Sequence, residues 1–107
     1  AVEGMVAAFR RRRDLAVRLF NELLPEVEYV QPDGAFYMYF KLDGTFGDDI
    51  DGSAAACTAM IEEEGVAIVP GVAFGDDRYA RMSVAAADDV LEDGIGRVAR
   101  WMRGRLG

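Results

Sequence analysis

The sequence contains no histidine, a single cysteine (Cys57) and a single lysine (Lys41) among its 107 residues. Histidine is the commonest general base of enzymes and lysine the usual amine nucleophile, so the chain has few groups for acid–base or covalent catalysis. A lone cysteine excludes an internal disulfide bond and fits a reducing compartment, so we expect a cytoplasmic protein. Because no apolar run approaches the roughly 18 residues of a membrane helix, we expect no membrane partner.

Basic residues are in the minority, with 12 lysines and arginines against 19 acidic residues and a net charge of −7. Nucleic-acid-binding proteins usually carry the opposite sign, so we expect no nucleic acid partner. The run RRRR (Arg10–Arg13) does not change this expectation, because consecutive residues on a helix point in different directions. The aspartate-rich segment DGTFGDDIDG lacks calcium-loop spacing, since Gly47 and Ala54 stand where ligands are required. We therefore expect no metal site.

Hydrophobic periodicity and turn residues divide the chain into seven elements. The predicted elements are a helix over residues 4–24, strands over 27–30 and 35–42, a helix over 53–64, strands over 66–71 and 78–86, and a helix over 88–102. This order predicts an α+β fold, with a mixed or antiparallel sheet of about four strands and helices packed on one face.

Several residues mark the expected ends of these elements. Pro25 is expected to end the first helix, because the residue before a proline avoids helical geometry. Asp51 or Ser53 is expected to cap the second helix and Gly65 to stop it. Asp88 or Asp89 is expected to cap the last helix. The wholly apolar segment VAIVPG (66–71) predicts a strand buried on both faces.

The segment YARMSVA (79–85) is a short apolar strand with one arginine near its centre. Alternation along a strand places Tyr79, Arg81 and Ser83 on one face and the apolar residues on the other. A guanidinium stays protonated in a protein, so Arg81 must reach water or an anion. The spacing alone favours a solvated polar stripe, and it is also compatible with a site where the planar fork of Arg81 binds a carboxylate.

Three segments occur in a characteristic order: PDGAFYMYF (32–40), EEGVAIVPGVAFG (63–75) and YARMSVAAADDVLEDGIGRV (79–98). Together they resemble the C-terminal, small domain of the fold-type I, class I/II pyridoxal-phosphate (PLP) dependent aminotransferases, the group that includes aspartate aminotransferase. The segment RRRDL (11–15) is similar to the helix by which that family enters the small domain. The resemblance covers nearly the whole chain and depends on the order and spacing of the segments.

The resemblance implies roles for several residues. In this family the arginine of the strand that matches YARMSVA binds the α-carboxylate of the amino-acid substrate, which implies that role for Arg81. The aromatic residue matching Phe36 lies at the edge of the substrate pocket, and Gly34 permits a tight turn or a close backbone approach. In a regular strand Tyr37 and Tyr39 point away from Phe36, so they are weaker candidates.

The resemblance also implies what this chain lacks. Family members bind PLP through a lysine of the large domain, and Lys41 lacks the serine-containing context of that lysine, so we interpret it as a surface residue. We therefore expect residues 1–107 to be the small domain of a longer chain, without catalytic or cofactor-binding residues and inactive alone. The implied full-length enzyme is a homodimer that transfers an amino group from an amino acid to a 2-oxo acid.

Two alternatives remain open on the sequence. Related PLP-dependent decarboxylases and lyases share this small domain, so the resemblance defines the reaction less closely than the fold. A non-catalytic, ACT-like module that senses amino acids is also a small α/β unit. Such modules usually run strand–helix–strand–strand–helix–strand, whereas this chain is predicted to begin and end on helices.

Overall fold

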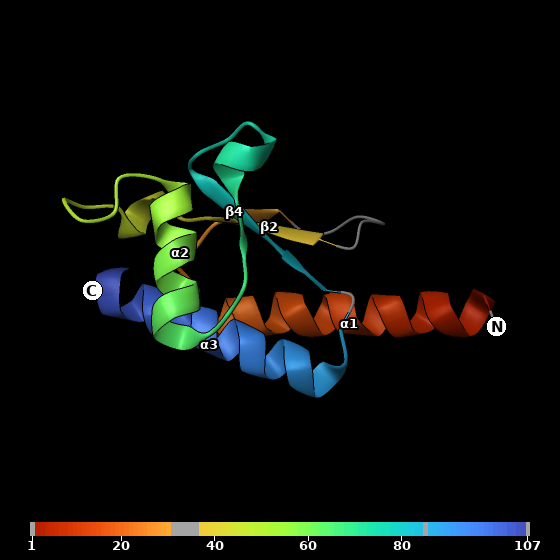
Figure 1. The fold of residues 1–107 in the computed structure, drawn as a ribbon. Helices are drawn as coiled ribbons and strands as arrows, with labels where there is room; N and C mark the ends of the chain where they lie inside the picture. The colour runs from red at the N-terminus through yellow and green to blue at the C-terminus, as the bar shows by residue number, and fades with distance from the viewer. Residues whose placement is uncertain (1, 31–36, 85, 107) are drawn as a thin grey trace.

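The computed structural model describes residues 2–30, 37–84 and 86–106 (Figure 1). Its elements are α1 (Val2–Leu23), β1 (Tyr29–Val30), β2 (Tyr37–Lys41), the 3-10 helix η1 (Asp43–Thr45), α2 (Ser53–Glu64), β3 (Val69–Pro70), the 3-10 helix η2 (Gly71–Phe74), β4 (Tyr79–Ser83) and α3 (Asp88–Leu106). The strands form one antiparallel sheet in the order β1-β2-β4-β3. The predicted α+β class and the predicted order of helices and strands are confirmed.

The long helices α1 and α3 run beside each other below the sheet, and α2 packs against α3 and β3 (Figure 1). Ion pairs join the two long helices at both ends of their contact. Arg11 lies 3.6 Å from Asp88 at the start of α3, and Arg103 near its end lies 2.8 Å from Glu26, just beyond α1. Across the described ranges, no helix is long and apolar enough to span a membrane.

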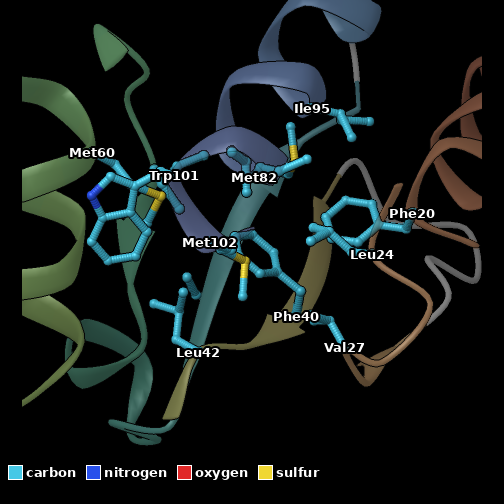
Figure 2. Close-up of a cluster of buried hydrophobic side chains, with 14 of the residues drawn as sticks. Phe20, Leu24, Val27, Phe40, Leu42, Met60, Met82, Ile95, Trp101 and Met102 are labelled. Carbon is cyan, nitrogen blue, oxygen red and sulfur yellow. The ribbon is translucent and has the colours of Figure 1, made fainter. Parts of the chain in front are cut away.

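A single hydrophobic core lies between the sheet and the helices (Figure 2). The strands contribute alternate residues to it: Met38 and Phe40 of β2, and Ala80 and Met82 of β4, are buried. Phe20 of α1 is fully buried, with its ring centroid 5.3 Å from that of Phe40. Because strand residues alternate between faces, the remaining positions of β2 and β4 form an open face on the side away from the core.

The strand predicted over residues 66–71 is shorter and more exposed than expected. Only Val69 and Pro70 form β3, which lies at the edge of the sheet, and Val69 is 36% exposed. The prediction of a strand buried on both faces is therefore wrong. Proline has no N–H for a ladder hydrogen bond, so Pro70 is suited to an edge strand. The first strand is also shorter, beginning at Tyr29 rather than Val27.

The ends of α1 and α2 are only partly as predicted. Helix α1 stops shortly before Pro25, and Gly65 ends α2 in the left-handed conformation with φ of 69°. The predicted cap of α2 by Asp51 or Ser53 is wrong, since the cap position is Gly52 and no cap side chain accepts a hydrogen bond there. Instead the Ser53 N–H donates a hydrogen bond to Oδ1 of Asp77 at 3.0 Å, and this acceptor lies 24 residues further along the chain.

Helix α3 begins at Asp88, one of the two predicted cap residues, and extends to Leu106, four residues beyond the predicted end. Tertiary hydrogen bonds hold this last turn. Arg105 donates from Nε to the Thr45 carbonyl oxygen at 2.9 Å and from Nη2 to Asp49 Oδ1 at 2.7 Å. These hydrogen bonds from Arg105 hold the pKa of Asp49 below its ordinary value. The extension depends on partners distant in sequence, which helical periodicity does not reveal.

Candidate functional site

The open face of the sheet carries the candidate site. On β4 the residues Tyr79 and Arg81 alternate with buried residues, as the sequence predicted, and on β2 the same holds for Tyr37 and Tyr39. The antiparallel register places Arg81 directly opposite Tyr39. Helices α1 and α3 lie on the far side of the sheet, while η2 rises on the open side (Figure 1). The site therefore consists of side chains from β2, β4 and η2.

Arg81 lies close to two aromatic rings. Its guanidinium carbon is 4.3 Å from the centroid of the Tyr37 ring and 5.4 Å from that of Phe74 in η2. Phe74 in turn packs edge-on against Tyr39, with centroids 5.2 Å apart and ring planes at 81°. A cation over an aromatic face gains about 0.5–1 kcal/mol when exposed and about 2 when desolvated. These rings stabilise the guanidinium without using any of its N–H donors.

The guanidinium of Arg81 has no counter-charge in the described part of the chain. Its Nε is buried and finds no hydrogen-bond acceptor there, and no described carboxylate forms an ion pair with it. By contrast, nine arginines pair with carboxylates: those at 11, 12, 13, 18, 78, 97, 100, 103 and 105. A buried cationic donor without an acceptor is costly, so this position favours an incoming anion.

The short helix η2 is held in place by hydrogen bonds to the start of α2. The Val72 N–H donates to Ser53 Oγ at 3.0 Å, and Ser53 Oγ donates to Asp77 Oδ1 at 2.7 Å. The hydrogen bonds from the Ser53 hydroxyl and amide hold the pKa of Asp77 below its ordinary value. Asp77 is therefore ionised at neutral pH, and its carboxylate accepts charge-assisted hydrogen bonds from Ser53.

An open depression of about 370 Å³ is lined by Tyr39 and Phe74, the two rings that pack on each other near Arg81, although Arg81 itself does not line it. Tyr79 also forms part of its wall, together with an ion pair between Arg78 and Asp76 at 3.0 Å. Arg78 donates hydrogen bonds to Asp76, which lowers the pKa of that carboxyl. Since the two charges of this pair are satisfied by each other, the depression offers mainly aromatic surface.

The structure describes only one of the three sequence-predicted site residues, and the role of each stays a prediction. Arg81 lies on the open face of the sheet, with its side chain partly buried. Gly34 and Phe36 lie outside the described residues, so their roles remain predictions. Two aromatic residues lie near the Arg81 guanidinium: Tyr37, which the sequence had marked only as a weaker candidate, and Phe74, which was not a candidate. Pairing of β2 with β4 would have identified the β2 tyrosines, but no local signal identifies Phe74.

Neither Lys41 nor Cys57, the two residue types here most often used as nucleophiles, is available for covalent chemistry. Lys41 Nζ lies 3.9 Å from Glu28 and 3.8 Å from Asp43, as expected of a surface lysine. Cys57 is 3% exposed in the core, and burial raises the pKa of its thiol to about 11. A thiol with such a pKa is almost wholly protonated at neutral pH, so Cys57 is a packing residue rather than a nucleophile.

The geometry defines an antiparallel α+β domain whose open sheet face carries an arginine without a carboxylate partner among the described residues. Residues 1–97 match the family model for aminotransferase class I and II, and the chain belongs to that family, matching its small domain. The amino-acid-sensing alternative finds no support in this match.

Curated relatives agree with this assignment. The chain is 41% identical over 103 residues to an aspartate/prephenate aminotransferase of Cereibacter sphaeroides, covering 91% of this chain and 26% of that protein. It is 37% identical over 105 residues to a bifunctional aspartate aminotransferase and glutamate/aspartate-prephenate aminotransferase of Petunia hybrida, covering 92% and 22%. The chain thus spans about a quarter of the length of these relatives.

Solved structures of similar proteins share the fold. An aromatic aminotransferase from Pyrococcus horikoshii OT3 superposes with a TM-score of 0.83 at 36% identity, covering 98% of this chain and 27% of that one. An aspartate aminotransferase from Thermotoga maritima gives a TM-score of 0.80 at 31% identity, covering 96% and 25%. The described fold is therefore one unit of larger enzymes in these relatives.

Proposed function

We propose that residues 1–107 are the small, C-terminal domain of a PLP-dependent aminotransferase, and that Arg81 binds the α-carboxylate of its amino-acid substrate. The observation that carries this proposal is the guanidinium of Arg81, which lies close to the rings of Tyr37 and Phe74 and has no described carboxylate as partner. The complete enzyme, a cytoplasmic homodimer, transfers the amino group to a 2-oxo acid. Relatives named as aspartate and prephenate aminotransferases support this reaction class.

The chemistry of the contact follows from the shapes of the two groups. A guanidinium presents parallel N–H donors that match both oxygens of a carboxylate, and such charge-assisted pairs are short and directional. The aromatic rings near the guanidinium accept no conventional hydrogen bond from it, so its N–H groups stay available to a carboxylate. A carboxylate fixed in this way holds the rest of the substrate in one orientation, which lowers the entropic cost of reaction.

The described residues do not form a PLP site by themselves. The cofactor needs an amine for its aldehyde, and the single lysine, Lys41, is engaged by Glu28 and Asp43. We therefore assign the cofactor and its lysine to a large domain of the same polypeptide. Within the described chain the role that remains is recognition, in which Arg81 binds and orients one end of the substrate.

Replacement of Arg81 in the complete enzyme tests this function. Arg81→Ala should raise the KM for the amino acid and lower kcat together, and Arg81→Lys should recover only part of the loss because it keeps the charge without the fork. Loss of a charge-assisted contact of about 1.5–3 kcal/mol predicts a fall in kcat/KM of roughly 10- to 150-fold. Steady-state kinetics with varied amino acid measure both constants.

Arg105→Ala provides a matched control, because Arg105 also lies near an aromatic ring, that of Trp101, but on the helical side and paired with Asp49. It should change stability without changing KM. Kinetics that stay the same in Arg81→Ala would remove this arginine from the site.

The chain on its own should be colourless and inactive after mixing with PLP and dialysis. The reason is that the one lysine, which would have to bind the PLP aldehyde, is ion-paired with Glu28 and Asp43. Visible absorbance and transaminase assays of the dialysed chain check this result. Retained yellow colour that disappears in Lys41→Ala would contradict it and place a cofactor site in this domain.

A further inference from the structure

A three-part hydrogen-bonded link connects segments that are far apart in the sequence. The Ser53 hydroxyl accepts from the Val72 N–H at 3.0 Å and donates to Asp77 Oδ1 at 2.7 Å, while the Ser53 N–H donates to the same carboxylate oxygen at 3.0 Å. Ser53 is fully buried. Its hydroxyl thus acts as donor and acceptor at once, and it joins the start of α2 to Val72 in η2 and to Asp77, three residues after η2.

The backbone around this link is tightly packed. Gly52 precedes Ser53, and a Cβ at Gly52 would lie 2.7 Å from Asp77 Oδ2. Gly71 begins η2, and its carbonyl oxygen accepts from the Asp76 N–H at 2.9 Å, closing the turn. Because the turn is closed on itself and tied to α2 by the Ser53 link, η2 has little freedom to move away from the sheet.

Phe74 is the part of η2 that reaches the site. It lies two residues after Val72, whose N–H is tied to Ser53, and its ring contacts Tyr39 and lies near the guanidinium of Arg81. Val72 itself is 55% exposed, so side-chain packing at that residue does little to hold the turn. The hydrogen bond to Ser53 therefore ties the backbone beside Phe74 to α2, in addition to the contact of its ring with Tyr39.

We propose that Ser53 and Asp77 are positioning residues for the Arg81 site, holding η2 so that Phe74 stays against the guanidinium and keeps its N–H groups in one orientation. This inference rests on the proposed carboxylate-binding role of Arg81. Neither residue contacts the guanidinium in the structure, and both act through the backbone of η2 and the ring of Phe74. Their removal should weaken carboxylate binding even though the charge of Arg81 is unchanged.

The test uses the complete enzyme and succinate, a dicarboxylate without an amino group, as the binding probe. Asp77→Ala and Ser53→Ala should each weaken succinate binding about two- to five-fold, the loss expected from one displaced cation–π contact. Asp77→Asn should restore most of the affinity, because the amide oxygen still accepts both hydrogen bonds from Ser53. The control Asp49→Ala breaks a comparable surface link, to Arg105, and should leave succinate binding unchanged.

Two further measurements separate positioning from general destabilisation. Amide hydrogen exchange over residues 71–75 should rise in Asp77→Ala and stay low in Asp77→Asn. In a double-mutant cycle, Asp77→Ala should add little to the effect of Phe74→Ala, since both remove the same contact. Additive effects, or faster exchange with unchanged succinate binding, would overturn the proposal.

Arg81→Ala in the same assay separates this inference from the proposed function. If Arg81→Ala weakens succinate binding and Asp77→Ala does not, the positioning role fails and the carboxylate role of Arg81 stands. If neither variant loses succinate, the carboxylate role fails and the positioning role fails with it.

Discussion

Gly71→Ala is expected to lower the free energy of unfolding by about 3 kcal/mol or more. A Cβ at this position would lie far inside van der Waals contact with the carbonyl oxygens of Asp76 and Tyr79. These are backbone atoms, and they belong to the turn that η2 closes and to the first residue of β4. They cannot move aside without opening the turn, so the substitution forces the whole segment to rearrange. Urea unfolding followed by circular dichroism measures the loss.

Gly96→Ala is the matched control for Gly71→Ala. Gly96 lies within α3, and a Cβ there meets nothing within 4 Å. Alanine in a helix interior is more stable than glycine by up to about 1 kcal/mol, so this variant should be slightly stabilised. A Gly71→Ala protein as stable as the wild type would show that the turn adopts another conformation than the one described.

Phe20→Ala is expected to lower the free energy of unfolding by about 3–5 kcal/mol, because a fully buried aromatic ring is removed and leaves a cavity. The ring lies 5.3 Å from that of Phe40 between centroids (Figure 2) and 5.8 Å from that of Tyr29, and so joins α1 to β2 and β1. Domains of this size are stable by only about 5–15 kcal/mol, so the loss is a large part of the total. Thermal unfolding monitored by calorimetry gives the change.

Leu23→Ala on the same helix is the control for Phe20→Ala. Leu23 is 37% exposed, and its carbonyl oxygen, which accepts from Arg103 at 2.6 Å, is unaffected by truncation of the side chain. Leu23→Ala should lower the free energy of unfolding by no more than about 1 kcal/mol. Equal losses for the two variants would show that the core does not centre on Phe20.

Those features of the fold that depend on local pattern could be predicted from the sequence. Helical spacing placed α1 and α2, Gly65 marked the end of α2, and alternation in YARMSVA separated Arg81 from the core residues of β4. The predictions that failed concern features that depend on contacts between segments distant in the sequence. The cap of α2 comes from Asp77, and the last turn of α3 is held by Arg105 through Thr45 and Asp49.

The candidate site was predicted in the same uneven way. Arg81 stands out locally, because a charged residue in an apolar strand requires an explanation. Its aromatic neighbours depend on strand pairing and on the path of η2. Tyr37 is brought near by the antiparallel register of β2 with β4, and Phe74 by the hydrogen bond between Val72 and Ser53. Neither relation leaves a periodic signal in the sequence.

The short edge strand β3 has a consequence for the behaviour of the protein in solution. Exposed sheet edges with unpaired N–H groups can recruit strands of other chains and start aggregation. This edge consists of only Val69 and Pro70, and the proline has no N–H to offer. A second molecule therefore meets almost no template there, and we infer that this side of the sheet resists edge-to-edge polymerisation even when the open face is unoccupied.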